Sequence, residues 1–280
     1  DLSPRQGHRV GSSVKMAETN RLLDRVYIVT GSASGIGRAV ALRIAGEGGV
    51  PLLLDLNEEG LRATAGAIES AGGRSAVLAG DVTDSDHPQH AVAFAQAEFG
   101  RIDGCVAAAG MICIRAIQEV TREEWEAVVA LNLTSVFFLV REVAEAAKAA
   151  GRGGSIVNLS STSAHGARPN NVDYGVSKIG IDHLTRTLAL EYAPSQIRVN
   201  AVSPGVTDTA MWRAVDLHRG AYLGMKPGEL TAKMVEAIPM KRVAQPGEIA
   251  SLVAWLLADE SAYMTGQIIE IDGGFKLGNP

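Results

Sequence analysis

From Arg25 onward, the chain alternates short runs of apolar, often β-branched residues with longer segments that have the spacing of amphipathic helices. This alternation constrains the fold more than any other feature, because strands that alternate with helices build parallel sheets. The apolar runs are continuous, which indicates strands covered by helices on both faces. We therefore expect an α/β fold with one doubly wound parallel sheet. Its seven predicted strands are 26–30, 51–55, 75–80, 104–109, 155–160, 197–202 and 267–271.

No internal repeat, low-complexity tract or linker interrupts this pattern. Residues 16–280 are therefore expected to be a single domain of Rossmann type, whose ligands bind beyond the carboxyl ends of the strands. Residues 1–15 have no helical or strand periodicity and no apolar stretch of the kind found in signal peptides. We interpret them as an added or disordered extension before Met16.

Charge and hydropathy favour a small-molecule ligand. The chain has 26 basic and 31 acidic residues, a net charge of -5, and no block of lysine or arginine, so we expect neither nucleic acid nor a membrane surface as a partner. No uninterrupted apolar run approaches the ~18 residues that a membrane span needs, so we expect a soluble protein.

The cysteines and histidines suggest neither a disulfide nor a metal site. Cys105 and Cys113 lie in or just beyond an apolar run, which is typical of free thiols in a reducing compartment, so we expect a cytoplasmic protein. His87 and His90 come nearest to the spacing of metal ligands. They are interpreted as the exposed start of a helix, without a third ligand, and no metal is expected.

A glycine-rich loop, TGSASGIG at residues 30–37, joins the first predicted strand to an amphipathic helix. Gly31 and Gly35 would let the backbone approach a pyrophosphate, and Gly37 would let the helix pack closely on the sheet. The helix N-terminus would then face the phosphates. The spacing of the glycines departs from G-x-G-x-x-G. The evidence for a dinucleotide site therefore comes mainly from the position of the loop between a strand and a helix.

Acidic residues at the next two strand ends complete a predicted dinucleotide site. Asp55 lies 18 residues after Gly37, where a carboxylate can bind the adenosine ribose and would repel a 2′-phosphate. Ser34 leaves the loop without a basic residue for that phosphate, so NAD is favoured over NADP. Alternatively, Asp55 is a loop or capping residue, with Asn57 competing for the cap. Asp81, followed by Val82, would receive the adenine or form a plain turn.

Three polar positions are ambiguous when each is considered alone. Tyr174 and Lys178 are four residues apart and would share a helix face, which is more often solvated than catalytic. Asn132 falls on the apolar stripe of a long predicted helix, about 122–149, and must be hydrogen-bonded there for a structural or a functional reason.

Six motifs in this order together resemble the short-chain dehydrogenase/reductase family over about residues 20–277. They are TGSASGIG at 30–37, Asn132, Ser161, YGVSK at 174–178, NAVSPG at 200–205 and TGQIIEIDGG at 265–274. The resemblance implies four catalytic residues. Tyr174 would be the general base or acid, Lys178 would lower its pKa and hold the nicotinamide ribose, and Ser161 would donate to the substrate oxygen. Asn132 would distort its helix so that its backbone carbonyl holds a water joined to Lys178.

The resemblance also implies the residues that bind the cofactor. Among them Thr207 is expected to act through its backbone N–H, and Thr209 is expected to contact the nicotinamide carboxamide. The full set is Gly31, Ser34, Gly35, Ile36, Gly37, Asp55, Leu56, Asp81, Val82, Ala109, Gly110, Tyr174, Lys178, Pro204, Gly205, Thr207 and Thr209.

The chain departs from the family after the fourth predicted strand. Where the family usually carries Asn-Asn-Ala-Gly, this chain has AAAG at residues 107–110. Small apolar packing would have to replace the missing amide hydrogen bonds, and a working site is still expected.

The substrate is expected to be set by two segments. Residues 210–240 are irregular in pattern and would form a lid over the cleft, or alternatively a helical insertion on the surface. The loop between Ser161 and Tyr174 carries His165 and Arg168, which are expected to be exposed and not to line the site. The chain end from Arg242 matches the part of the family that builds subunit contacts, which implies a homotetramer.

The resulting prediction is an NAD-dependent oxidoreductase that transfers hydride reversibly between the nicotinamide and a secondary alcohol or polyol, or its ketone. One alternative is a biosynthetic 3-oxoacyl-[acyl-carrier-protein] reductase. Another is a non-catalytic NAD-binding sensor module.

Overall fold

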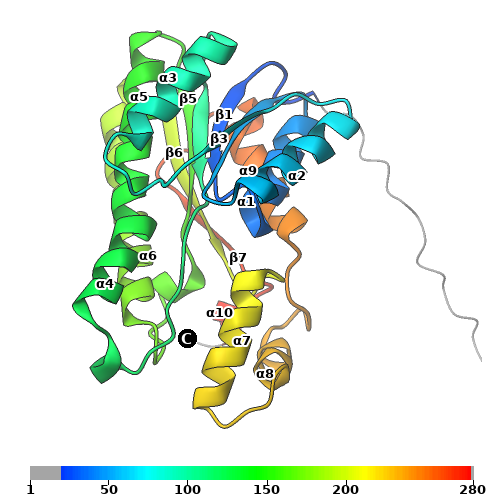
Figure 1. Cartoon of the computed structure of the whole chain (residues 1–280), viewed down its shortest axis with the longest axis vertical. Coiled ribbons are helices and arrows are strands. Elements are labelled where there is room, and N and C mark those ends of the chain that lie inside the picture. The colour runs from blue at the N-terminus through cyan, green and yellow to red at the C-terminus, as the bar shows by residue number, and fades with distance from the viewer. Residues whose placement is uncertain (1–19, 279–280) are drawn as a thin grey trace, which may run out of the picture.

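Seven parallel strands form one sheet in the order β3-β2-β1-β4-β5-β6-β7 (Figure 1). The structure is a computed structural model and describes residues 20–278, so the predicted extension at 1–15 lies outside the described residues. Every predicted strand is present, with ends that shift by at most two residues. The strands are Val26–Thr30 (β1), Val50–Asp55 (β2), Ala76–Ala79 (β3), Gly104–Ala107 (β4), Gly154–Leu159 (β5), Ile197–Pro204 (β6) and Ile268–Ile271 (β7).

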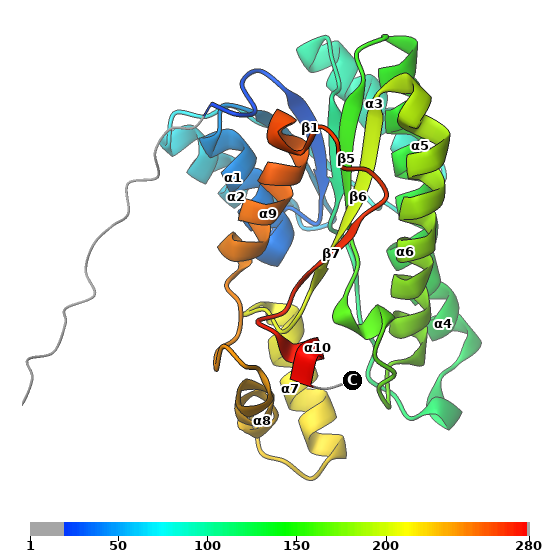
Figure 2. The same cartoon turned by 180° about the vertical axis from the view of Figure 1, so that it is seen from behind.

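Helices cover both faces of the sheet (Figures 1 and 2). Ile28 belongs to a buried cluster with helix residues such as Val140 and Ile181, whereas the next residue, Val29, packs with Ile44 and Val253 on the opposite face. Neighbouring strand residues therefore both face apolar layers, which explains the continuous apolar runs. One layer holds α1 (Gly35–Gly46), α2 (Glu58–Ser70) and α9 (Pro246–Leu257), and the other holds α3 (His87–Phe99), α5 (Ser135–Ala149) and α6 (Val172–Tyr192).

The order of the strands reverses between β1 and β4, because the chain first builds outward to β3 and then crosses back to the other side of β1. Open parallel sheets bind ligands at such a switch point, beyond the carboxyl ends of the strands. Here the loop after β1 meets the loop after β4: a Cβ added to Gly31 would lie 2.9 Å from the backbone of Ala109.

The predicted long helix consists of three parts: α4 (Arg122–Val129), a π-helix at Ala130–Thr134 and α5. Together they span Arg122–Ala149. This segment is long and apolar enough to cross a membrane, because its most apolar 18-residue window has a mean hydropathy of 1.7. Val136, Val140 and Val143 are buried in the cluster beneath the sheet. The segment is therefore a core helix.

Residues 210–240 contain α7 (Ala210–Tyr222) and α8 (Glu229–Ala237), which lie beyond the carboxyl ends of the strands (Figure 1). Their role as a lid stays a prediction.

One local expectation was wrong. His87 does begin α3, but it is only 8% exposed. Its imidazole fills the space beside Gly80, where an added Cβ would come within 2.8 Å of the ring. This burial lowers the pKa of His87.

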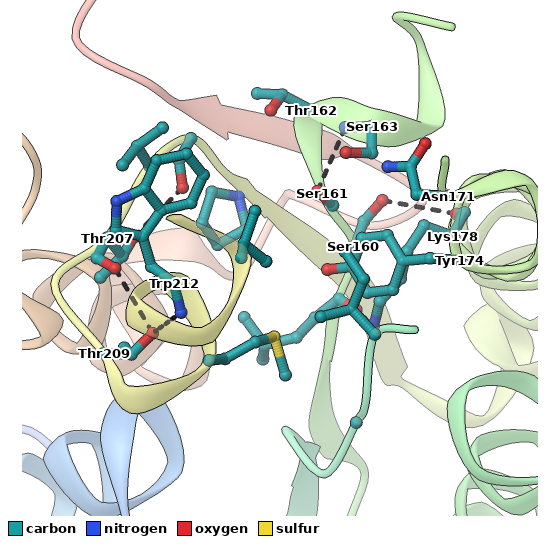
Figure 3. Close-up of a pocket in the computed structure, with 18 of the residues that line it drawn as sticks. Ser160, Ser161, Thr162, Ser163, Asn171, Tyr174, Lys178, Thr207, Thr209 and Trp212 are labelled. Atoms are coloured by element: carbon teal, nitrogen blue, oxygen red, sulfur yellow. Dashed lines mark hydrogen bonds between the residues drawn. The ribbon is translucent and has the colours of Figure 1, made fainter. Parts of the chain in front are cut away.

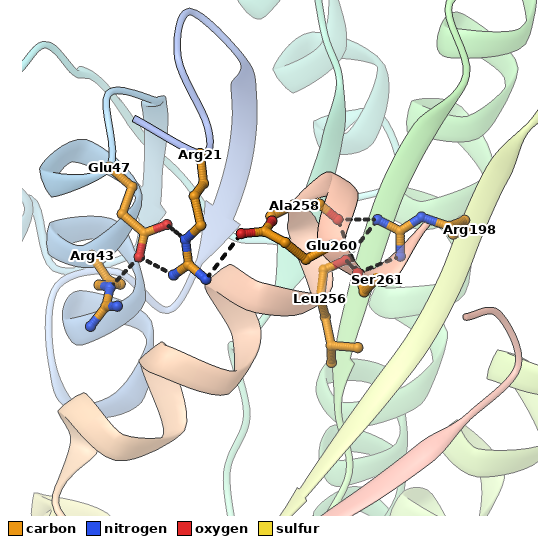
Figure 4. A network of polar contacts seen from close by, with 8 residues as sticks. All are labelled: Arg21, Arg43, Glu47, Arg198, Leu256, Ala258, Glu260 and Ser261. Carbon is orange, nitrogen blue, oxygen red and sulfur yellow. Dashed lines mark hydrogen bonds and ion pairs between the residues drawn. The ribbon is translucent and has the colours of Figure 1, made fainter. Parts of the chain in front are cut away.

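A polar network ties the last part of the chain to the sheet (Figure 4). Arg198 on β6 donates to the carbonyls of Leu256 and Ala258 and to the Ser261 hydroxyl, at 2.8, 3.1 and 3.0 Å. These bonds hold the short helix Asp259–Ser261, which precedes β7. Beside it, Arg21 pairs with Glu47 at the end of α1. The network thus joins the end of α1 and the end of α9, two helices that pack against each other.

Candidate active site

A cavity opens beyond the carboxyl ends of β4, β5 and β6, with an open volume of about 910 Å³ including its mouth. Ser161, Tyr174 and Lys178 line one side of it (Figure 3). Thr207 and Trp212 face them from the other side. The loop after β5 and the first turns of α6 thus bring together the three polar residues that the resemblance implied.

A second cavity adjoins the first along the glycine loop. The two share Ile36, Ala108, Gly110, Thr209 and Met211 as lining residues. Every residue of the predicted cofactor set lines one cavity or the other. The two cavities therefore form one continuous site along which the predicted cofactor residues are arranged.

The glycine loop has the backbone that a close-fitting phosphate site requires. Gly31 and Gly35 have φ angles of +69° and +54°, in the left-handed region that favours glycine. A Cβ on Gly37 would lie 2.2 Å from the carbonyl oxygen of Gly31, so only glycine lets α1 begin this close to the loop. The first residues of α1, Gly35, Ile36 and Gly37, line the second cavity, and a helix N-terminus is suited to binding a phosphate.

Asp55 links the glycine loop to the end of β2. Its carboxylate accepts hydrogen bonds from the backbone N–H groups of Ala33 (3.2 Å) and Asn57 (3.0 Å) while lining the second cavity. The capping role belongs to Asn57, which accepts from the Gly60 N–H at 3.0 Å. Asp55 is thus held in place without being used as the helix cap.

Asp81 takes the turn role that was its alternative. Its carboxylate accepts from the N–H of Thr83 at 2.8 Å and from the Thr83 hydroxyl at 2.7 Å. These bonds hold the pKa of Asp81 below its usual value. Because Asp81 and Val82 also line the second cavity, the turn leaves the adenine contact possible.

The AAAG segment is held by Thr30 instead of by asparagine amides. The Thr30 hydroxyl accepts from the N–H groups of both Ala108 and Ala109, each at 3.0 Å. The Ala108 side chain packs against an apolar cluster. A threonine on β1 and apolar contacts therefore fix the backbone at the switch point.

Asn132 lies within the π-helix and is fully buried. Its Oδ1 accepts from the Met111 N–H at 2.9 Å, and its Nδ2 donates to the Met111 carbonyl at 2.8 Å and to the Ser177 hydroxyl at 3.2 Å. The side chain thus fastens the loop after β4 to α6. The distortion of the helix that the resemblance implied is present, whereas the water on the Asn132 carbonyl stays a prediction.

Tyr174 and Lys178 lie one turn apart on α6, with the ammonium 5.6 Å from the centroid of the phenol ring. Lys178 donates to the Leu159 carbonyl at 2.7 Å. Burial lowers the pKa of Lys178 to about 8, opposed by Asp182. Burial raises the pKa of Tyr174, opposed by Ser161 and Arg168. In this structure, Ser161 and Arg168 make the contribution that the sequence analysis assigned to Lys178.

Thr209 caps α7, since its hydroxyl accepts from the Trp212 N–H at 3.2 Å. It also lies at the junction of the two cavities, where the predicted carboxamide contact would occur. Gly205 is required next to Asp272, because a Cβ there would come within 2.8 Å of it.

Several residues around the first cavity were missed. Arg168 was expected to be exposed, but it is partly buried, with its guanidinium 5.1 Å from the centroid of the Phe275 ring. His165, in contrast, is exposed as expected and does not line the first cavity, although its imidazole lies 2.7 Å from Asp182, a fully buried carboxylate on α6. Met211, Val215 and Arg219 line the cavity from one face of α7. Their spacing of four residues was the available signal.

Comparison with known proteins gives a consistent result. A family model described as enoyl-(acyl carrier protein) reductase matches residues 31–276. A 3-oxoacyl-[acyl-carrier-protein] reductase of Thermotoga maritima is 35% identical over 257 residues, which are 92% of this chain and 100% of that protein. A D-threitol dehydrogenase of Mycolicibacterium smegmatis is 36% identical over 257 residues, 92% of this chain and 95% of the relative.

The solved structures agree with the sequence comparison. The crystal structure of a short-chain type dehydrogenase/reductase from Mycobacterium marinum is 32% identical, with a TM-score of 0.83 over 92% of this chain and 98% of that one. Agreement at this level, over nearly the whole length of sequence and fold, means that the chain belongs to the short-chain dehydrogenase/reductase family of NAD(P)-dependent oxidoreductases acting on alcohols and ketones.

Proposed function

We propose that this protein is an NAD-dependent dehydrogenase that oxidises a secondary alcohol or polyol, and reduces the corresponding ketone in reverse. The observation that carries the proposal is the junction of the two cavities. Ser161, Tyr174 and Lys178 line the cavity that joins the dinucleotide-shaped one, so a hydroxyl carbon can sit between them and the nicotinamide. When bound, NAD supplies the hydride acceptor.

In the proposed mechanism, the Tyr174 phenolate removes the hydroxyl proton of the alcohol, while Ser161 donates a hydrogen bond to the same oxygen. In the reverse direction, the Tyr174 phenol returns the proton. Lys178 holds the nicotinamide ribose and adds positive charge beside Tyr174. Ser161 and Lys178 are buried and Tyr174 is partly buried, which strengthens their electrostatic effect on the substrate oxygen.

A proton path would connect Lys178 to solvent through a water held by the backbone carbonyl of Asn132. The positions of the two residues support it, because both lie beside Gly110: Asn132 Oδ1 and Lys178 Nζ are 3.2 and 3.8 Å from the position of a Cβ added there. The π-helix also frees backbone groups from the regular α-helical pattern.

The preference for NAD follows from Asp55. A carboxylate fixed by two backbone N–H groups at the end of β2 would bind ribose hydroxyls and repel a 2′-phosphate. The loop residue Ser34 supplies no compensating positive charge at that end of the cavity.

We further propose a cytoplasmic homotetramer. Apolar side chains are exposed along α5 and α6: Phe138 at 38%, Val176 at 44%, Ile179 at 43% and Leu190 at 81%. Such a face is typical of a subunit contact. Sedimentation equilibrium should give four times the chain mass, and a monomer would contradict the proposal.

A panel of secondary alcohols, polyols and cyclic alcohols, each with NAD and with NADP, tests the activity. We expect reduction of NAD by at least one alcohol, and Tyr174→Phe should lower the rate by about 10²–10⁴-fold, the usual loss of a general base. Calorimetry should show unchanged NAD binding by the variant. A Tyr174→Phe enzyme with a near wild-type rate would refute the assignment of Tyr174 as the general base.

A second candidate is reduction of a 3-oxoacyl thioester, which the similarity to the Thermotoga enzyme favours. Faster turnover of such a thioester with NADPH than of any alcohol with NAD would establish it. A non-catalytic sensor, the remaining alternative, would bind NAD and turn over nothing in either assay.

A further inference from the structure

Two arginines from different segments line the first cavity together with Tyr174. Arg168 comes from the loop between Ser161 and Tyr174, and Arg219 comes from the cavity face of α7. Both are partly buried. The two segments that surround the space beside the reacting groups therefore each contribute one guanidinium.

Neither guanidinium is neutralised by the protein. Within residues 20–278, no hydrogen bond or ion pair is formed by either side chain, and Arg168 contacts only the Phe275 ring as a cation–π partner. Burial lowers the pKa of Arg168. Burial also lowers the pKa of Arg219, and the positive charge of Arg168 lowers it further. Two like charges thus line one cavity without an ion-pair partner in the described part of the chain.

The acidic residues of α7 and of the loop before it are already paired. Asp216 accepts from the N–H groups of Gly228 (2.6 Å) and Thr231 (2.7 Å), and Asp208 pairs with Arg213 at 2.5 Å. No aspartate or glutamate is among the residues that line the cavity. In a chain of net charge -5, this cavity is a local site of positive charge.

Unpaired guanidiniums at a ligand cavity are suited to a planar oxyanion, which each fork can bind with two parallel hydrogen bonds. Burying them without such a partner would be costly. The remaining lining of the cavity includes Ile112, Met211 and Val215, which can contact a carbon skeleton.

We propose that the substrate is a hydroxy acid: a secondary alcohol, or its ketone, that carries a carboxylate bound by Arg168 and Arg219. The hydroxyl lies at Ser161 and Tyr174, and an apolar skeleton spans the distance to the two arginines. This proposal rests on the proposed function, because it assigns the alcohol that the same site oxidises.

Binding of non-reacting probes tests the arginines without turnover. Calorimetry on the NAD-saturated enzyme would compare benzoate, benzamide and phenylphosphonate. We expect benzoate to bind ~10-fold or more tightly than benzamide, because a hydrogen bond to a charged group typically strengthens binding by more than ~10-fold. Arg168→Met and Arg219→Met should abolish the difference, and Arg219→Lys should keep part of it.

The control is Arg213→Met, which removes the same charge from the solvent-exposed face of α7 and should keep the preference for benzoate. Circular dichroism and NAD affinity would show that each variant is folded. Equal binding of benzoate and benzamide by the wild type would overturn the proposal. So would loss of the preference in Arg213→Met, or tighter binding of phenylphosphonate, which would indicate a phosphate.

Measurements of turnover provide a second test of the proposal. The panel would be 3-hydroxybutanoate, 4-hydroxypentanoate and 4-hydroxycyclohexanecarboxylate, each beside its methyl ester. We expect kcat/KM to favour the acid, and Arg219→Met to raise KM for the acid while leaving the ester unchanged. If the esters react faster, the carboxylate assignment fails and the dehydrogenase stands. If benzoate binds through the arginines but no alcohol or acid reacts, the proposed function fails and the anion site stands.

Discussion

The Lys178 ammonium lies 5.6 Å from the centroid of the Tyr174 ring, one turn along the same buried helix. Burial acts on the two groups in opposite directions: it raises the pKa of Tyr174 and lowers the pKa of Lys178 to about 8. Both shifts favour the neutral form. In the absence of cofactor, therefore, ionisation of Tyr174 depends on Ser161 and Arg168, the two groups that oppose burial.

Ser161→Ala should move the pH profile of alcohol oxidation to higher pH. Ser161 lowers the pKa of Tyr174, so its removal raises that pKa, and the phenolate forms only at more alkaline pH. The measurement is kcat/KM for oxidation against pH. Ser160→Ala is the control, because that hydroxyl faces the Lys178 carbonyl at 3.5 Å. An inflection at the same pH in wild type and Ser161→Ala would refute the role.

Lys178→Met should change how the free energy of unfolding depends on pH. Between about 8 and the ordinary value of 10.5, Lys178 is neutral in the folded protein and protonated in the unfolded chain. The unfolded state then binds more protons, so the wild type gains stability as pH rises. Tyr174 acts in the opposite direction only above its ordinary value of 10.

Urea unfolding between pH 8 and 10 checks this prediction. The free energy of unfolding of the wild type, minus that of Lys178→Met, should increase with pH. A difference that is constant across this window would mean that Lys178 keeps its ordinary pKa in the folded state.

The sheet could be predicted because each strand is buried on both faces, which leaves a continuous apolar run such as VYIVT in the sequence. The helix α7 was left as one of two alternatives. Its face at Met211, Val215 and Arg219 borders the first cavity, so the apolar positions Met211 and Val215 are followed by a charged one. The helical spacing is present there, but it is weaker than the apolar stripe of a helix that packs on the core.

Most of the site residues lie at strand ends or on α6. They could be predicted because the strand and helix patterns and the order of the family motifs indicate the same positions. Arg168 was misjudged because its burial depends on Phe275, far along the chain. Contacts between distant segments determine such burial, and the spacing of residues along one segment does not report them. His87 was misjudged for a different reason, because its ring fills the space left by Gly80, which lies only seven residues before it.

Asp55→Asn should shift the cofactor preference toward NADP. The amide oxygen can still accept from the Asn57 N–H, but the charge that repels a 2′-phosphate is gone. We expect the ratio of kcat/KM for NADP to that for NAD to rise by ~10-fold or more, the equivalent of one 1.4 kcal/mol interaction. Glu58→Gln is the matched control, because it removes one exposed charge nearby. An unchanged ratio in Asp55→Asn would contradict the ribose role.

Thr30→Val should destabilise the protein, and Thr30→Ser should not do so to the same degree. Valine keeps the shape of threonine but removes the acceptor that the N–H groups of Ala108 and Ala109 share. Thr30 is 3% exposed, so water cannot easily replace it. Leaving partly buried N–H groups unsatisfied costs about 1–3 kcal/mol. Serine keeps the hydroxyl and loses one methyl group, at about 1 kcal/mol.

Urea unfolding at neutral pH measures both variants, and calorimetry measures their affinity for NAD. Because the backbone after β4 lies against Gly31, Thr30→Val should also weaken NAD binding, whereas Thr30→Ser should retain it. Equal stability and equal affinity in the two variants would show that the apolar contacts of the AAAG segment suffice to hold the switch point. A loss confined to Thr30→Val would establish that one hydroxyl on β1 replaces the amides that the family usually carries there.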